Sequence, residues 1–230
     1  TTINGQLMLA MLIEALILAG FKVIGANTDA VNVLVPNDRW DEYQAICTAW
    51  EKITSMGLDH DVFTAIYEQS CNNYIAVEES GKVKTKGTFV PELELLKGYK
   101  YPVVKTALLK YFTEGVSIEK TIREHDDIYD FCISTKMGKS KKTGLMFEAI
   151  HNGVKLQRTN RYFASTGKDT AYLYKCAGLA NEHVLADSGV TVFNKYIKKE
   201  MKDYGINYNF YIRQARKVQQ EIEPEQLGLF

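Results

Sequence analysis

The chain has 230 residues, 46% hydrophobic and 24% charged, as expected for one large or two small globular domains. The 28 Lys and Arg balance the 28 Asp and Glu, so net charge neither supports nor excludes a nucleic-acid partner. The Cys residues lack the close pairs of a structural zinc site, and we expect reduced, buried thiols and no disulfides at Cys47, Cys71, Cys132 and Cys176.

The N-terminal region predicts a helix over residues 3–20, rich in Leu, Met, Ala and Ile and ending at Gly20, a typical helix stop. The apolar run Leu7–Gly20 is interrupted by Glu14 and is too short for a membrane span, so we expect a buried core helix. Because Thr1 runs almost directly into this helix, we also expect that upstream sequence is missing.

A hairpin follows the helix. Residues 21–26 and 31–35 are short apolar runs that predict two buried strands, and Asn27, Thr28, Asp29 and Ala30 provide the turn between them. A carboxylate on such a turn is held rigidly and suits a divalent metal used in phosphoryl transfer, because Mg²⁺ prefers hard oxygen ligands. The alternative is an ordinary turn whose polar side chains only bond the local backbone.

The remaining elements follow from periodicity and turn residues. We expect a basic, exposed loop at 136–142 and a boundary near 90–101 between a β-rich first part and a mostly helical second part. The expected strands lie at 61–67, 73–78, 82–87, 154–164 and 171–174, the last two around a turn at Gly167. The expected helices lie at 39–56, 103–112, 117–124 with Ser117 as N-cap, and 208–222.

The order helix, strand, Asn-Thr-Asp turn, strand, helix resembles the palm of family B DNA polymerases around their Asp-Thr-Asp-Ser turn. The helix segment from Asn4 through Glu14 is similar to the helix that precedes that turn. The resemblance implies that Asp29 is a catalytic residue and a Mg²⁺ ligand, because the second Asp of the turn is a metal ligand in the family. Here Asn27 replaces the first Asp and Ala30 replaces the Ser.

A second resemblance lies in the hairpin of residues 72–87. Tyr74, Lys84, Lys86 and Gly87 match a family B pattern beside the primer terminus, whereas Asn72 and Asn73 stand where the family usually has Lys. Alternation along a strand places Lys82, Lys84 and Lys86 on one face, a geometry suited to a phosphate backbone. The alternative is an edge strand that carries Lys to prevent aggregation.

The second half resembles a family B thumb, which grips duplex DNA through its phosphates. Residues 105–131 resemble its helical start and residues 207–217 its closing helix. Within its basic residues we select Arg158 and Arg161 as candidate DNA contacts, against the alternative of an ordinary soluble surface. The four His residues are scattered, and we assign them no role.

The last residues resemble the pentapeptide by which bacterial and phage polymerases bind the sliding clamp. Its defined positions match Gln226, Leu227, Leu229 and Phe230, and Pro224 with acidic neighbours suggests a mobile tether. Such a tail would place Leu and Phe in an apolar pocket. The alternative is an apolar C-terminus packed against its own domain.

The sequence therefore predicts an α+β fold in three parts: the C-terminal part of a palm (1–95), a mainly helical thumb (96–222) and a clamp-binding tail (223–230). The resemblance implies template-directed nucleotidyl transfer with Mg²⁺, dNTP and primer–template DNA, with no membrane, in the cytoplasm of a bacterial or phage-infected cell. The family's other catalytic Asp lies upstream, so an upstream segment or partner chain must supply it. The alternative is a non-catalytic DNA-binding or clamp-associated protein derived from a polymerase.

Overall fold

The computed structural model describes residues 2–90 and 100–223. These residues form an α+β fold, as predicted, in which every sheet is antiparallel. The helices are α1 (Thr2–Leu18), α2 (Trp40–Thr54), α3 (Pro102–Glu114), α4 (Ile118–Glu124) and α5 (Tyr208–Ile222), with short 3-10 turns η1 (Asn37–Arg39), η2 (Gly87–Phe89), η3 (Ile128–Phe131) and η4 (Met201–Tyr204).

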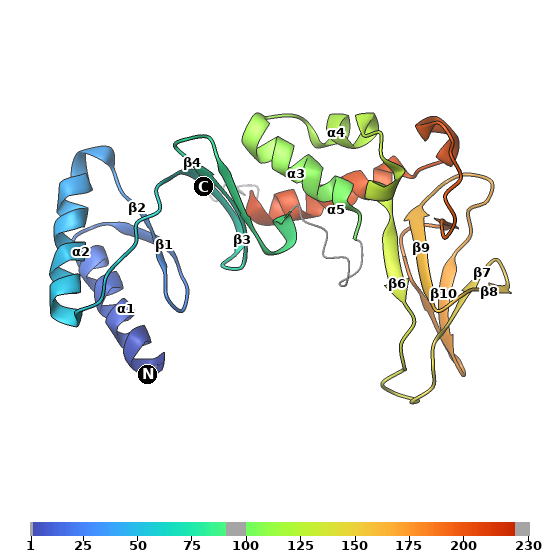
Figure 1. Cartoon of the computed structure of the whole chain (residues 1–230), viewed down its shortest axis with the longest axis horizontal. Helices are drawn as coiled ribbons and strands as arrows, with labels where there is room; N and C mark the ends of the chain where they lie inside the picture. The colour runs from blue at the N-terminus through green and yellow to red at the C-terminus, as the bar shows by residue number, and fades with distance from the viewer. Residues whose placement is uncertain (1, 91–99, 224–230) are drawn as a thin grey trace, which may run out of the picture.

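The strands form four sheets in the described residues. Their bounds are β1 (Lys22–Ala26), β2 (Val31–Leu34), β3 (Phe63–Ser70), β4 (Asn73–Glu78), β5 (Val83–Lys86), β6 (Ile133–Lys136), β7 (Glu148–His151), β8 (Val154–Lys155), β9 (Thr159–Ala164), β10 (Leu173–Ala177), β11 (Ala180–His183) and β12 (Val190–Val192). Figure 1 shows an elongated molecule with the β1–β2 hairpin and α1–α2 at one end, the β3–β5 sheet with α3–α5 in the middle, and the remaining strands at the other end.

The N-terminal part is a hairpin packed on two helices. Helix α1 ends at Leu18, two residues before the predicted stop at Gly20. Gly20 has a φ of +83°, and the backbone N–H of Phe21 donates to the carbonyl of Leu16 at 2.9 Å, which closes the last helical turn. The indole N–H of Trp50 on α2 donates to the carbonyl of Met8 at 2.7 Å. The buried residues of this core are Leu9, Leu12, Leu16, Phe21, Cys47 and Trp50.

The expectation that the first helix is buried in a core was wrong for half of its surface. Leu9, Leu12 and Leu16 are buried, but Ile3 is 70% exposed and Leu18 is 80% exposed. Because apolar residues occupy every side of α1, its periodicity alone could not show that only one side contacts α2 and the hairpin.

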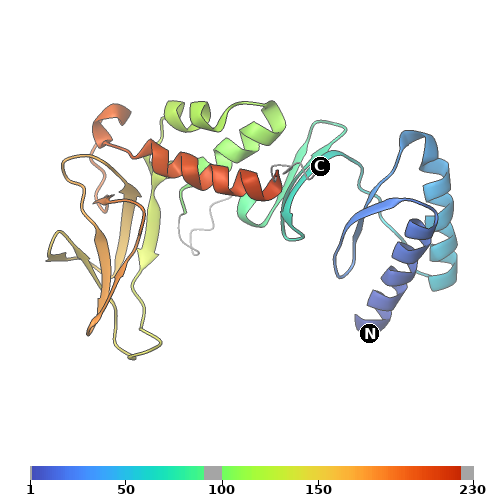
Figure 2. The ribbon, with the colours of Figure 1, turned by 180° about the vertical axis from the view of Figure 1, so that it is seen from behind.

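The middle part holds the largest hydrophobic cluster, in which Ile75 of β4 and Phe89 of η2 pack with α3, α4 and α5. Figure 2 shows α5 running alongside α3 and α4 from the β3–β5 sheet toward the C-terminal strands. Tyr211 of α5 is fully buried, and its hydroxyl donates to the carbonyl of Phe131 at 2.7 Å and accepts from the N–H of Ala164 at 2.8 Å. Burial raises the pKa of Tyr211, so the hydroxyl keeps the proton that these bonds require.

Several predicted elements of this half are confirmed. Helix α5 has the predicted bounds, and Ser117 caps α4, its hydroxyl accepting from the N–H of Lys120 at 3.3 Å. The strand expected at 61–67 instead spans Phe63–Ser70. The expected domain boundary lies largely in residues 91–99, outside the described residues, and stays a prediction.

The expectation of a mainly helical second half was wrong, because β6–β12 form two sheets there, in the orders β12-β9-β6 and β11-β10-β7-β8. A small core lies between these strands, with Met137, Tyr162 and Leu173 among its buried residues. The single strand expected at 154–164 was wrong, because it is divided into β8 and β9, which belong to different sheets. The strand expected at 171–174 is shifted to β10, Leu173–Ala177. The expected loop at 136–142 is present, although Met137 and Ser140 within it are buried.

All four cysteines are unpaired, as predicted. Cys47 and Cys132 are buried, and burial raises the pKa of Cys132 to about 12, which keeps its thiol protonated and unreactive. The expectation of burial was wrong for Cys71, which is exposed at the β3–β4 turn, and only partly right for Cys176, which is half-buried.

Candidate metal and nucleic-acid site

The predicted turn lies at the tip of the β1–β2 hairpin. Strand β1 pairs with β2 so that Ala26 lies opposite Val31, and the N–H of Asn27 donates to the carbonyl of Ala30 at 2.8 Å. Val23 and Val33 on one side of the hairpin pack against the N-terminal core. One face of the hairpin thus packs against the N-terminal core, whereas the other face, with Ile24 and Leu34, and the tip are exposed.

Asn27 and Asp29 have different surroundings at this tip. The side-chain oxygen of Asn27 accepts from the N–H of Thr28 at 2.7 Å and from its hydroxyl at 3.2 Å, so it stabilises the turn itself. The Asp29 side chain is exposed and makes no hydrogen bond or ion pair with any described residue. Asp29 therefore has a free carboxylate that fits the oxygen chemistry of Mg²⁺.

One carboxylate is an incomplete donor set for a metal ion. Across residues 2–90 and 100–223, no three His, Cys, Asp or Glu side chains lie close enough together to hold a metal ion. A Mg²⁺ ion on Asp29 would need further oxygen ligands, which substrate phosphates and water can supply.

The second predicted group lies on the β3–β5 sheet. The register aligns Glu68, Tyr74 and Lys86 across the three strands, and in the next row it aligns Ile66, Ala76 and Lys84. These six residues define the outer face of the sheet. The other face carries Tyr67, Ile75 and Val83, which pack against the core formed with α3 and α5.

Three of the predicted contact residues share this outer face. The ammonium of Lys86 lies 5.9 Å from the ring centre of Tyr74. That of Lys84 donates to Asp61 at 2.9 Å, a hydrogen bond that raises the pKa of Lys84. Lys82 precedes the strand and is exposed. The outer face thus carries Lys84, which is partly neutralised by Asp61, and Lys86, which has no ion-pair partner among the described residues. Lys82, just before β5, likewise has none among them.

Gly87 ends this strand in a conformation that requires glycine. Its φ is +67°, and a side chain there would overlap the backbone carbonyl of Asn72 and the side chain of Asn73. Asn73 occupies this space because its amide oxygen accepts from the N–H of Thr88 at 2.9 Å. The close approach at Gly87 fixes the end of β5, and with it the position of Lys86, against the β3–β4 turn.

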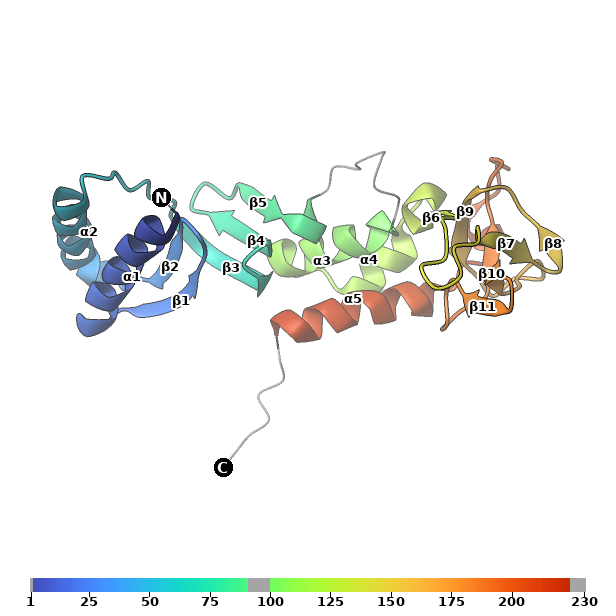
Figure 3. The ribbon, with the colours of Figure 1, turned by 90° about the horizontal axis from the view of Figure 1, so that it is seen from below.

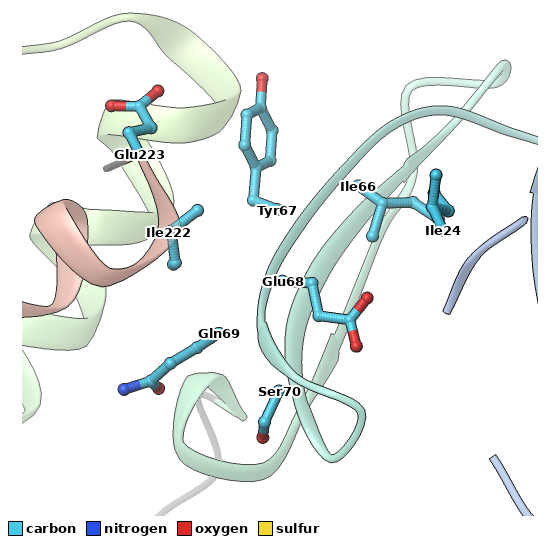
Figure 4. A pocket seen from close by; sticks show the side chains of 8 residues that line it. All are labelled: Ile24, Ile66, Tyr67, Glu68, Gln69, Ser70, Ile222 and Glu223. Carbon is cyan, nitrogen blue, oxygen red and sulfur yellow. The ribbon is translucent and has the colours of Figure 1, made fainter. Parts of the chain in front are cut away.

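A pocket lies between strand β1 of the N-terminal hairpin, strand β3 of the sheet and the end of α5 (Figure 4). Along β3 the side chains alternate, so that Ile66 and Glu68 point toward Ile24 of β1 while Tyr67 points toward α5. A methyl group at Gly25 would lie 3.4 Å from a carboxylate oxygen of Glu68. Glu68 could not be predicted at this position, because nothing in the periodicity of β3 shows that its outer face meets the hairpin.

Arg158 and Arg161 lie far from the hairpin, in the C-terminal strands. Arg158 is exposed, and its guanidinium donates to the carbonyl of Met137 at 3.2 Å. The guanidinium of Arg161 lies 5.0 Å from the ring centre of Tyr129 and is half-buried. The predicted residues therefore occupy three regions, namely the hairpin tip, the outer face of the sheet and the C-terminal strands, which Figure 3 shows along the length of the molecule.

The clamp-binding residues Gln226, Leu227, Leu229 and Phe230 lie outside the described residues. In the part of the chain that is described, no helix is both long and apolar enough to span a bilayer.

Comparison with known proteins leaves the family open: no protein-family model and no curated protein matches this chain.

Proposed function

We propose that this chain is part of a DNA-directed DNA polymerase of the family B type, which adds nucleotides to a primer 3′ end under the direction of a template. The observation that carries the proposal is Asp29, an exposed carboxylate at the tip of a hairpin that packs one face against the N-terminal core. The outer face of the following sheet supports it, because that face presents Lys84 and Lys86 beside Tyr74.

In the proposed reaction, Asp29 would be one of the ligands of two Mg²⁺ ions that activate the primer 3′-hydroxyl and stabilise the leaving pyrophosphate. The hairpin positions this carboxylate, and its exposure leaves room for the substrate phosphates. Lys82, Lys84 and Lys86 would bind phosphates of the primer strand without reading its sequence. The second catalytic carboxylate would come from an upstream segment or a partner chain, so the chain alone is not expected to polymerise.

We propose in addition that the last residues bind a sliding clamp, and that Arg158 and Arg161 face the duplex product. These contacts would keep the polymerase bound to DNA and would not change the rate of the chemical step. Removing Leu229 and Phe230 should therefore leave single nucleotide addition unchanged while shortening the products made in the presence of a clamp.

A second candidate function is non-catalytic binding of primer–template DNA. The observation that favours it is Asn27, which lacks a charge and whose side-chain oxygen is already bonded to Thr28. A protein with this turn would keep the lysines of the sheet but would hold metal ions weakly.

Template-directed primer extension separates the two candidates. The protein is isolated under native conditions, so that any partner chain remains attached, and is given a 5′-labelled primer–template, dNTP and Mg²⁺. A polymerase adds the nucleotide complementary to the template and stops on addition of EDTA. A protein of the second kind retards the primer–template in a gel, and the primer stays at its starting length at all metal concentrations.

Replacing Lys82, Lys84 and Lys86 together with Ala tests the outer face. Each lysine that contacts a phosphate of duplex DNA contributes about 0.9 to the slope of log affinity against log salt. The triple variant is expected to lower this slope by about 2 for primer–template DNA, because Asp61 already neutralises Lys84 in part. Fluorescence anisotropy at several salt concentrations measures the slope.

The matched control replaces three exposed lysines on the helices, Lys52, Lys110 and Lys120, and should leave the slope near that of the wild type. Equal slopes for the wild type and the Lys82, Lys84 and Lys86 variant would remove the outer face from the DNA contact.

A further inference from the structure

The extended segment 194–199, which joins β12 to η4, combines an exposed aromatic ring with basic side chains. It contains Lys195, Tyr196, Lys198 and Lys199, all of them exposed. Neither the proposed polymerase chemistry nor the predicted duplex contacts involve this segment.

The ring of Tyr196 is held in place from one side. It stacks on Tyr129 of η3, with ring centres 5.9 Å apart and an angle of 14° between the planes. Phe193 meets it edge-on at 6.2 Å and 76°. Tyr196 is nevertheless 57% exposed. The structure therefore presents an aromatic surface that is pre-positioned by its neighbours and open to solvent.

A cation lies close to this stack. The guanidinium carbon of Arg161 is 5.0 Å from the ring centre of Tyr129, so Arg161 and Tyr196 both contact Tyr129. Stacked aromatic rings with a nearby Arg are the groups on which unpaired nucleic-acid bases stack, because every base has a π-face.

The backbone of the segment is fixed at both ends. The side chain of Asn194 accepts from the N–H of Arg161 at 2.9 Å and donates to the Asn160 side chain at 2.9 Å. At the other end, the Tyr204 hydroxyl donates to the carbonyl of Ile197 at 2.8 Å and accepts from the N–H of Lys199 at 3.1 Å. Tyr196 is thus presented by a segment that loses little freedom when a ligand binds.

The charge around Tyr196 favours a polyanion. Lys195, Lys198 and Lys199 have no ion-pair partner among the described residues, and Glu200 beside them pairs with Lys202 at 2.6 Å. Lys195 and Lys199 also line a hollow of about 520 Å³ together with Lys168, although Asp169 and Asp203 contribute to it as well.

The acidic side chains of Asp127 and Asp130, near Tyr129, are hydrogen-bonded to residues close to them in sequence. Asp130 lies 2.6 Å from the ring nitrogen of His125, and Asp127 accepts from the N–H of Tyr129 at 2.8 Å. The carboxylates on this side are therefore held in place, and the exposed segment itself carries only positive charge.

We propose that Tyr196 is a stacking platform for an unpaired base of single-stranded nucleic acid, whose phosphates are bound by the lysines of segment 194–199. The proposal rests on the proposed nucleic-acid partner of this chain, but it requires no catalysis. It assigns a contact with single-stranded nucleic acid to a part of the molecule that the sequence predicts to bind only duplex DNA.

The test compares Tyr196→Ala with Tyr196→Phe, which keeps the ring, and with Tyr172→Ala, which removes another exposed tyrosine (46% exposed) just before β10. Binding of a fluorescent oligo(dT) and of an abasic strand of the same length is measured by anisotropy. Loss of one base–aromatic stack costs about 1–3 kcal/mol, so Tyr196→Ala should weaken oligo(dT) binding about 5- to 150-fold.

Three further results are expected. Tyr196→Phe and Tyr172→Ala should bind oligo(dT) like the wild type. The abasic strand should bind equally well to the wild type and to Tyr196→Ala, because it has no base to stack. The salt dependence should be unchanged in Tyr196→Ala, because no charge is removed.

The proposal is overturned if the wild-type protein fails to bind oligo(dT), if Tyr196→Ala binds it like the wild type, or if the same loss occurs with the abasic strand. Primer extension is measured in a separate assay. In natively isolated protein that keeps any partner chain, primer extension without the stacking effect refutes the platform alone, whereas stacking on oligo(dT) without any extension refutes the polymerase alone.

Discussion

Replacing Asp29 with Asn is expected to lower template-directed primer extension by about a thousandfold, because an uncharged amide is a weak ligand for a hard cation. A bound metal ion supplies several kcal/mol of transition-state stabilisation, and about 4 kcal/mol corresponds to a thousandfold in rate. The substitution keeps the shape of the side chain, and Asp29 makes no bond to a described residue that its loss would break. The rate of single nucleotide addition under saturating dNTP measures the effect.

The matched control is Asp59→Asn, an exposed carboxylate in the segment between α2 and β3, which should extend primers at the wild-type rate. Both variants should retain the thermal transition of the wild type and its affinity for primer–template DNA. An Asp29→Asn protein that extends primers at a tenth of the wild-type rate or faster would show that Asp29 is not a metal ligand in the reaction.

The second large effect is expected for stability, on replacing Gly87 with Ala. A left-handed conformation costs an L-residue about 1–2 kcal/mol, and the added methyl group would overlap Asn72 and Asn73, which forces the β3–β4 turn to shift. Overpacking of this kind costs about 1–3 kcal/mol, so we expect a loss of roughly 3 kcal/mol in the free energy of unfolding. Urea denaturation measures it.

Gly81→Ala is the control for the cost of the left-handed backbone conformation. Its φ is +80°, but nothing lies within 4 Å of an added methyl group, so the expected loss is only about 1 kcal/mol. The difference between the two variants reports the overlap at Gly87. Equal losses would mean that the end of β5 is not held by the close approach to Asn72 and Asn73.

Several elements could be predicted because local residue choice determines them. The turn at Asn27–Ala30 separates two apolar runs, and Ser117 precedes a helical pattern, so a single short stretch specifies each feature. The alternation of Lys82, Lys84 and Lys86 likewise predicted a strand with a basic face, and β5 places Lys84 and Lys86 on the outer face.

The features that the sequence did not predict depend on tertiary contacts. The apolar residues of α1 surround the helix, so their pattern could not distinguish Leu12, which is buried, from Leu7, which is exposed. Several strands between β6 and β12 have four residues or fewer, too few for alternation to give a clear signal. The surroundings of Glu68 and Tyr196 are formed by segments distant in sequence, namely β1 for Glu68 and η3 for Tyr196.

The central claim is that Asp29 binds a catalytic metal ion, and the most direct test is the metal dependence of an Asp29→Cys variant. Thiolate is a soft ligand that suits Mg²⁺ poorly and accepts softer ions such as Mn²⁺ or Cd²⁺ better. The account predicts that natively isolated protein carrying Asp29→Cys fails to extend a primer with Mg²⁺ and recovers extension with Mn²⁺ or Cd²⁺, while Asp59→Cys behaves like the wild type with every metal. Extension by Asp29→Cys with Mg²⁺ alone, or a wild-type protein that extends with none of these ions, would contradict the account.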